Sequence, residues 1–263
     1  MQSTILVVVF FVTSGVSVVT GSTSVITVPV MFQLGIDARA AVATNMFALT
    51  FMSIGGSLPF LKTNTVNNRR LPLLIALTLI GSVIGALLLL LIPSRVVPVI
   101  VSTAIIGVAV FSMAYRRSGA GLSPLPPNRG LEKAGYALTF LLGVYGGLFS
   151  GGYVTILTAL FVATFRMTFI EAIATTKLIN VFSSGVATLI FLRRGLVDFR
   201  LGAILGVTMF LGALLGARYA CRLSNLWLWR IYLAVVWLLG LKILFFDLIG
   251  HHGSPSQTPA LSK

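Results

Sequence analysis

Cysteine, histidine and acidic residues are all scarce in this chain of 263 residues, which holds 1 cysteine, 2 histidines and 5 acidic side chains. Because Cys221 stands alone, no internal disulfide bond can form. His251 and His252 are adjacent and the acids are scattered, without HExxH or CxxC spacing, so no metal ion or other cofactor is expected. Ser150 lacks the GxSxG elbow of a serine hydrolase. The sequence therefore predicts a protein that is not an enzyme.

Charge of either sign is also rare: 9% of the residues are charged, 57% are hydrophobic, and the mean hydropathy is +1.03. An ordinary soluble domain carries about 25% charged residues, so a soluble fold of this composition could not cover its surface. The charges gather at short breaks between apolar runs, such as 62–70 and 193–200. This pattern predicts an all-α integral membrane protein.

The few charges are mostly basic and give a net charge of +14. No basic stretch is interleaved with aromatic residues, so nucleic-acid binding is not expected. Lysine and arginine at the ends of spans instead hold loops in the cytoplasm and meet anionic headgroups, which makes membrane lipid the expected partner. The first apolar run lacks a basic start and an A-x-A site, so it is interpreted as a retained span.

Apolar segments long enough to cross a bilayer, which takes about 20 residues, recur along the whole chain. There are eight: 3–34, 38–60, 71–92, 96–115, 132–165, 168–192, 200–221 and 227–249. A Gly-, Pro- and Arg-rich stretch separates the first four from the last four. The predicted organisation is a first transmembrane repeat (1–115), a basic linker (116–131), a second transmembrane repeat (132–249) and a disordered polar tail (250–263).

The two halves match at a constant offset of 131 residues, which favours an internal duplication. The matched pairs include Gly15 with Gly146, Gly21 with Gly152, Arg69 with Arg200, Gly81 with Gly212, and Gly85 with Gly216. Transporters with internal repeats bind their substrates near the repeat interface. Gly81 and Gly85, like Gly212 and Gly216, have the GxxxG spacing that is typical of helices that approach closely, so these glycines are assigned no chemistry.

Segments 3–34 and 132–165 are longer than one span, and Gly and Ser interrupt each at the same place in the repeat, 20–24 and 149–153. Broken helices are favoured there over close packing through small residues. If every segment crosses once, the basic loops 61–70 and 193–200 share the cytoplasmic side with both termini, and the repeats are parallel. If the two long segments are re-entrant hairpins, the repeats are inverted. The sequence leaves both topologies open.

Lys177 lies well inside the apolar segment 168–192. A cation at the centre of a span costs about 2.5–3.5 kcal/mol or more and usually faces a cavity or a partner. Glu171 is not on the same helical face, so the counter-charge is either a distant acid such as Asp198 or Asp247, or an anionic substrate. A structural ion pair and a snorkelling lysine both remain open.

Polar residues of both halves complete the candidate binding site. Helices that restart after a break present free N–H groups and the positive end of a dipole, which suits an anion. The predicted substrate-binding residues are Lys177, Asn180, Asn45, Thr44, Thr176, Gly21, Ser22, Thr23, Ser24, Ser150, Gly151 and Gly152. Asp37 and Glu171 are conceivable proton carriers, although both lie near segment ends.

The stretch 174–185 (ATTKLINVFSSG), followed by 194–202 (RGLVDFRLG), resembles the second-repeat signature of the TauE/SafE family of sulfite and organosulfonate exporters. The stretch from Gly21 to Asn45 resembles the first-repeat signature, except that Gly21-Ser-Thr-Ser24 replaces the usual glycine run. The likeness extends to about residue 245. The resemblance implies a bacterial inner-membrane permease for sulfite, sulfonates or related sulfur anions.

The sequence and the resemblance together predict a secondary transporter that exports a small sulfur-containing anion by alternating access between the two repeats. Lys177 would be the main electrostatic contact, and the amides and helix N-termini would orient the oxygens. An anion channel lined by the same residues, and a membrane enzyme or non-transporting partner subunit, are the alternatives. A homo-oligomer stays open, as do the coupling ion and the exact substrate.

Overall fold

The computed structural model describes residues 2–21, 23–62, 69–117, 129–224 and 227, and every regular element in these ranges is helical. The elements are α1 (Gln2–Thr20), α2 (Thr23–Gln33), α3 (Ala38–Lys62), α4 (Leu71–Leu91), the 3-10 turn η1 (Ser94–Val96), α5 (Val97–Arg117), α6 (Arg129–Leu148), α7 (Tyr153–Phe165), α8 (Phe169–Arg193) and α9 (Phe199–Ala220). Among them, α3, α4, α8 and α9 are long and apolar enough to cross a membrane. The predicted all-α, multi-span character is confirmed. The predicted tail and nearly all of the last predicted segment lie outside the described residues.

Both long segments are interrupted where the sequence places the breaks. α1 ends at Thr20 and α2 begins at Thr23, whereas α6 ends at Leu148 and α7 begins at Tyr153. Gly21 and Gly152 have φ values of 71° and 75°, in the left-handed region that glycine enters without steric cost. Each break therefore starts a change of chain direction.

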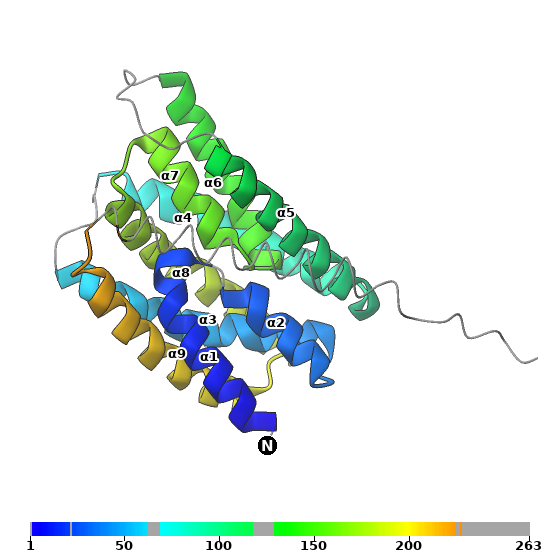
Figure 1. Cartoon of the computed structure of the whole chain (residues 1–263). Coiled ribbons are helices and arrows are strands. Elements are labelled where there is room, and N and C mark those ends of the chain that lie inside the picture. Colours follow the sequence, from blue (N-terminus) through cyan, green and yellow to red (C-terminus); the bar gives the residue numbers. More distant parts are fainter. Residues whose placement is uncertain (1, 22, 63–68, 118–128, 225–226, 228–263) are drawn as a thin grey trace, which may run out of the picture.

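The first break turns the chain back on itself, so that α1 and α2 form a helical hairpin (Figure 1). Gly15 lies against Gly216 and Phe11 against Gly212, so α1 runs parallel to α9. α2 runs antiparallel to α3, because Thr23 contacts Met52 and Thr27 contacts Asn45. We call α1 and α2 the first hairpin.

The second break produces a matching hairpin of α6 and α7. Arg70, before α4, forms a 2.8 Å ion pair with Glu132 at the start of α6 and donates to the Phe165 carbonyl at the end of α7. The free ends of this hairpin, the start of α6 and the end of α7, therefore lie at the same end of the molecule as the start of α4. We call this end of the molecule the Arg70 end. The opposite end, where Thr44 near the start of α3 accepts a hydrogen bond from the Asp198 N–H before α9, is the Asp198 end.

The central helices α3 and α8 are antiparallel. Thr50 contacts Thr188, Ser53 contacts Asn180, and Gly56 lies beside Lys177, so residue numbers rise in one helix as they fall in the other. The free ends of the first hairpin lie at the Asp198 end of the molecule, and those of the second hairpin lie at the Arg70 end. The last residues of α3 and α8, Lys62 and Arg193, consequently lie at opposite ends of the molecule, which contradicts the alternative in which loops 61–70 and 193–200 share one side. The reason is that each break reverses the direction of the chain within its half.

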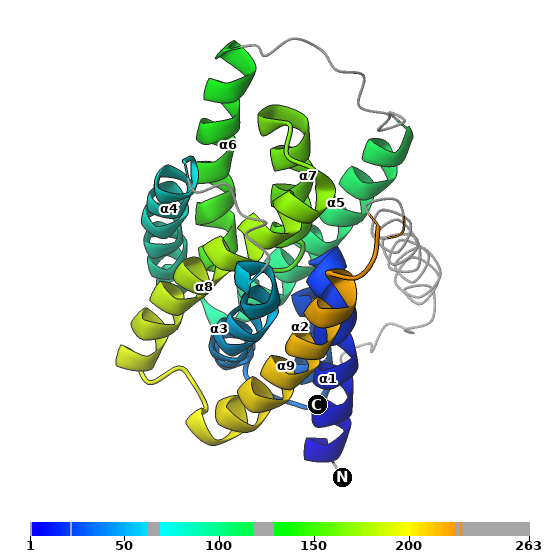
Figure 2. The same cartoon turned by 90° about the vertical axis from the view of Figure 1, so that its left-hand side faces the viewer.

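Glycine contacts fasten each hairpin to a helix from the other half of the chain. A Cβ on Gly85 of α4 would lie 2.0 Å from the Val144 carbonyl oxygen of α6, and one on Gly216 of α9 would lie 2.2 Å from the Gly15 carbonyl oxygen of α1. Figure 2 shows both pairs, α4 beside α6 and α9 beside α1. The prediction that the GxxxG pairs allow close helix approach is confirmed.

Candidate functional site at the hairpin tips

The tips of the two hairpins meet about halfway along α3 and α8. The Ser24 and Ser150 hydroxyls lie 2.7 Å apart, and the Thr155 hydroxyl donates to the Thr20 carbonyl oxygen at 2.5 Å. A Cβ on Gly21 would lie 2.7 Å from the Thr155 nitrogen, so this glycine is required by the close approach as well as by its φ. Two segments more than 120 positions apart in sequence thus share one buried polar contact.

Asn45 joins this contact from α3. Its amide nitrogen donates to the Ser24 hydroxyl at 2.8 Å, and its amide oxygen accepts from the Thr27 hydroxyl at 2.7 Å. All three side chains are buried. Because one amide proton of Asn45 is not needed for these bonds, the side chain can hold the tip and still offer a donor.

Lys177 is 2% exposed, and its Nζ donates to the Ser17 carbonyl oxygen at 3.0 Å. Ser17 lies in the last turn of α1, where the helix dipole places partial negative charge. Its carbonyl also accepts from the Gly21 N–H at 2.8 Å. The side-chain stem passes Gly56 of α3. The charge is thus held at the tip of the first hairpin.

No acidic side chain in the described ranges lies within ion-pair distance of Lys177. Asp198 caps α9 instead by accepting from the Leu201 N–H, so the predicted alternative of an Asp198 partner is wrong. Asp247 lies outside the described residues. An ammonium has three donors, and the Ser17 carbonyl occupies one of them. Lys177 therefore retains donors for a ligand oxygen.

The other predicted site residues make separate contacts around the tips. The Asn180 amide donates to the Ser53 hydroxyl at 2.7 Å, Thr176 lies 3.2 Å from the Thr158 hydroxyl, and Thr23 donates to the Met52 sulfur at 3.4 Å. Gly151 accepts from the Tyr145 hydroxyl through its carbonyl, and Gly152 provides the left-handed turn. Ser22 lies outside the described residues.

Thr44 is the predicted residue that does not join the tips. Its hydroxyl accepts from the Asp198 backbone N–H at 3.1 Å and so anchors the start of α9. Its role here is to fix the α8–α9 turn against α3. The neighbouring Asn45 points to the tips because successive residues of a helix project about 100° apart.

Further polar residues lie around the hairpin tips and are not among the predicted site residues: Ser17, Thr27, Ser53, Tyr153, Thr155 and Thr158. We call the polar residues around the tips the polar cluster. The sequence carries a signal for five of them, because hydroxyl residues stand 131 residues apart in the pairs Thr27 and Thr158, Ser24 and Thr155, Ser53 and Ser184, and Ser22 and Tyr153. A search for hydroxyl residues paired at the repeat offset would have found them. Ser17 has no such signal, since it contributes a backbone carbonyl.

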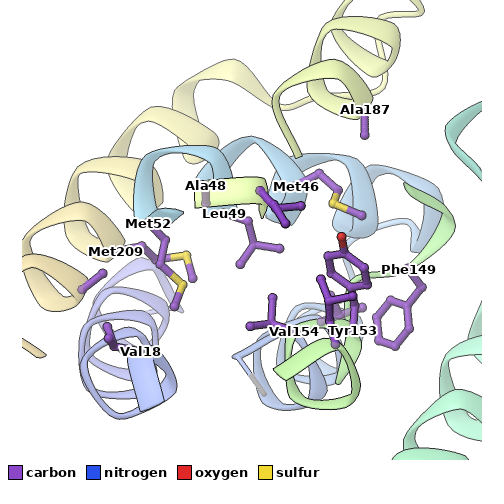
Figure 3. Close-up of a cluster of buried hydrophobic side chains, with 14 of the residues drawn as sticks. Val18, Met46, Ala48, Leu49, Met52, Phe149, Tyr153, Val154, Ala187 and Met209 are labelled. Atoms are coloured by element: carbon purple, nitrogen blue, oxygen red, sulfur yellow. The ribbon is translucent and has the colours of Figure 1, made fainter. Parts of the chain in front are cut away.

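The polar cluster is enclosed by apolar side chains. Figure 3 shows Val18 of α1, Met46, Leu49 and Met52 of α3, and Val154 of α7 packed around the tips. Such surroundings exclude water and strengthen the interaction between a donor and an anion. The described residues contain no group of three metal-ligating side chains. Hydroxyl, amide and ammonium donors with two helix N-termini suit a small oxyanion better than a cation.

Asp37 is fixed at the Asp198 end, away from this cluster. A hydrogen bond from Ser94 holds the pKa of the Asp37 carboxyl below its usual range, and the backbone N–H groups of Arg39 and Ala40 act in the same direction. A carboxyl with a lowered pKa stays ionised near neutral pH. Asp37 is therefore poorly suited to carry a proton, and it serves as the N-terminal cap of α3.

Comparison with known proteins finds a family model and several relatives that match most of this chain. A family model described as "Sulfite exporter TauE/SafE" matches residues 5–243. The chain is 29% identical over 217 residues to the probable membrane transporter protein ORF9 of Sinorhizobium sp, covering 80% of each chain. It is 26% identical over 206 residues to the probable membrane transporter protein YfcA of Escherichia coli K12, covering 76% of this chain and 74% of the relative. A probable membrane transporter protein of Haemophilus influenzae is 25% identical over 223 residues. No solved structure matches significantly.

Proposed function

This chain belongs to the TauE/SafE family of multi-pass membrane transporters, and on that basis we propose that it exports a small sulfur-containing anion, such as sulfite or an organosulfonate. The observation that carries the proposal is the buried Lys177, which has no acidic partner in the described ranges and lies where the two hairpins meet. The names of the family and its relatives indicate transporters rather than enzymes. A bacterial inner membrane is the proposed location.

The proposed architecture is a pair of inverted repeats. Shifting α3 (Ala38–Lys62) by 131 residues gives the bounds of α8 (Phe169–Arg193). The same shift relates the Thr27–Asn45 contact to the Thr158–Thr176 contact. Inverted repeats can exchange conformations, which gives alternating access around a fixed central site.

The proposed binding step moves Lys177 from a carbonyl to the substrate. In the structure described here the ammonium is held by Ser17 at the C-terminal end of α1. An entering anion offers a full negative charge, against the partial charge of a helix end, so Lys177 shifts its spare donors to the anion. Asn45 and Asn180 lie on the flanking faces of α3 and α8 and would orient the oxygens. Separation of the tips then carries the anion past the Ser24–Ser150 contact.

The Arg70 end is proposed to face the cytoplasm, because basic residues favour that side. The helix ends and loops at the Arg70 end hold Lys62, Arg69, Arg70, Arg129, Lys133, Arg166, Arg218 and Arg222. Those at the Asp198 end hold Arg39, Arg95, Arg193, Arg194 and Arg200. In this orientation the first hairpin enters from the periplasmic side and the second from the cytoplasmic side.

The test is flux of a panel of sulfur anions into proteoliposomes that contain the purified protein. Sulfite and short organosulfonates are expected to saturate and to show trans-stimulation, whereas flux through a channel would show neither. Lys177→Ala should abolish the flux and Lys62→Ala, at an exposed position, should leave it intact. Normal flux in Lys177→Ala, or no flux of any sulfur anion in the wild-type protein, contradicts the proposal.

A further inference from the structure

Tyr153 is the largest fully buried side chain in the part of the chain that the structure describes. It is the first residue of α7, at the tip of the second hairpin, and its exposed fraction is 0%. Its ring is fixed closely, since a Cβ on Gly146 of α6 would lie 2.9 Å from it. The ring is therefore held in one place by packing alone, without help from its hydroxyl.

The Tyr153 hydroxyl has no hydrogen-bond partner of normal geometry among the described residues. Burying a hydroxyl without a partner destabilises a protein, and phenylalanine would supply the same ring without that penalty. Tyr145, a half-buried tyrosine of the same hairpin, differs because its hydroxyl donates to the Gly151 carbonyl. The Tyr153 O–H is thus a rigid, buried donor that the described fold does not use.

The surroundings of this hydroxyl combine apolar side chains, such as that of Met46, with uncharged polar ones. It faces the Ser183 side chain of α8, and Ser183 in turn donates weakly to the Asn180 amide oxygen at 3.4 Å. The same Asn180 binds Ser53 of α3. In Figure 3 the hydroxyl is directed to the side of the cluster on which Met46 lies. These groups form a short polar row between α7, α8 and α3.

This row lies at a different level of the bundle from Lys177. Lys177 is level with Gly56 of α3 and with the tip of the first hairpin. Asn180 lies beside Ser53 of α3. Ser183, three residues after Asn180 in α8, faces Tyr153 at the tip of the second hairpin. At the repeat offset, Lys177 corresponds to Met46. One hairpin tip therefore meets a cation, and the other meets a methionine and a tyrosine hydroxyl.

We propose that the Tyr153 and Ser183 hydroxyls form a second, uncharged contact for an oxygen of the transported anion, at the tip of the second hairpin. This proposal rests on the proposed anion transport. Lys177 captures the anion by its charge, and the uncharged contact receives one oxygen as the anion passes between the tips. A neutral contact holds an anion less tightly than an ammonium does, so it favours passage over retention.

The experiment compares Tyr153→Phe with Tyr145→Phe in proteoliposomes and by thermal unfolding in detergent. For Tyr153→Phe, the KM for sulfite should rise roughly tenfold, the effect of one lost hydrogen bond, while the Tm of the ligand-free protein should stay the same or increase. Tyr145→Phe should instead lower the Tm, because it removes a hydroxyl that bonds the protein itself.

The outcomes separate this proposal from the proposed transport function. An unchanged KM in Tyr153→Phe, with flux still lost in Lys177→Ala, overturns the second contact and leaves the transport function intact. A lowered Tm in Tyr153→Phe with an unchanged KM also overturns it, because the hydroxyl would then be structural. If the wild-type protein moves no sulfur anion, both proposals are overturned together.

Discussion

Replacing Lys177 by methionine separates the charge of this residue from its bulk. Methionine already occupies position 46, which is related to position 177 by the repeat offset and is 1% exposed in α3. An unbranched side chain therefore fits this place in the fold. The variant should reach the membrane in normal amounts and should lose transport.

The expected magnitude follows from the site. Truncating one partner of a buried, hydrogen-bonded charge pair costs about 2–5 kcal/mol, which corresponds to about 30-fold to about 4,000-fold in kcat/KM at 1.4 kcal/mol per factor of ten. The effect on stability has the opposite sign. A buried ammonium without an acidic partner carries a desolvation penalty of several kcal/mol, and one carbonyl at 3.0 Å offsets only part of it. The Tm of Lys177→Met should therefore equal or exceed that of the wild-type protein.

Sulfite flux in proteoliposomes and thermal unfolding of the same preparations measure the two quantities, with Lys62→Met as the matched control at an exposed helix end. Loss of flux together with an unchanged or raised Tm supports the reasoning. Flux within threefold of the wild-type value, or a large fall in Tm, refutes it, because the ammonium would then be dispensable for transport or required by the fold.

Three further experiments test the surrounding structure. Ser24→Ala removes the hydroxyl shared by the two tips and leaves the Asn45 amide short of a partner, so the Tm should fall by the equivalent of about 1–3 kcal/mol and the KM should rise in the same flux assay. Gly85→Ala should strongly reduce the yield of folded protein in size-exclusion profiles, since its Cβ would lie 2.0 Å from a backbone oxygen, whereas Gly107→Ala, with open space around it, should not. Single cysteines at Lys62 and Arg194, in a chain whose natural cysteine is replaced by serine, should react with an impermeant thiol reagent from opposite sides of the membrane; labelling from the same side contradicts the antiparallel arrangement of α3 and α8.

The local features of the site were predictable from the sequence because they depend on residue type. Gly21 and Gly152 mark the breaks, since a left-handed turn at membrane depth calls for glycine. Lys177 stands out because a cation in an apolar segment is costly. The membrane-spanning character follows from composition alone. The signals at the two glycines and at Lys177 are each confined to a few neighbouring positions.

The direction of the chain after each break was not predictable, because a glycine permits a reversal without requiring one. The contacts that set the direction, such as Thr23 with Met52 and Arg70 with Glu132, join residues far apart in sequence. The two basic loops carried no decisive information, since both ends of the molecule hold arginines. The position of Thr44 away from the tips has a similar origin: its partner is a backbone N–H, which has no signature in the sequence.

The glycine contacts at Gly85 and Gly216 have a consequence for how the polypeptide can be divided. Each hairpin is fastened along its length to a helix encoded in the opposite half of the chain. Neither half, produced by itself, supplies the helix that packs against the backbone groove at these glycines. Two separate polypeptides, cut within the linker, should remain inert when made individually and should regain transport only when made together in one cell. A shuffled protein that takes one half from a relative would have to match the groove of the other half before its binding site could form.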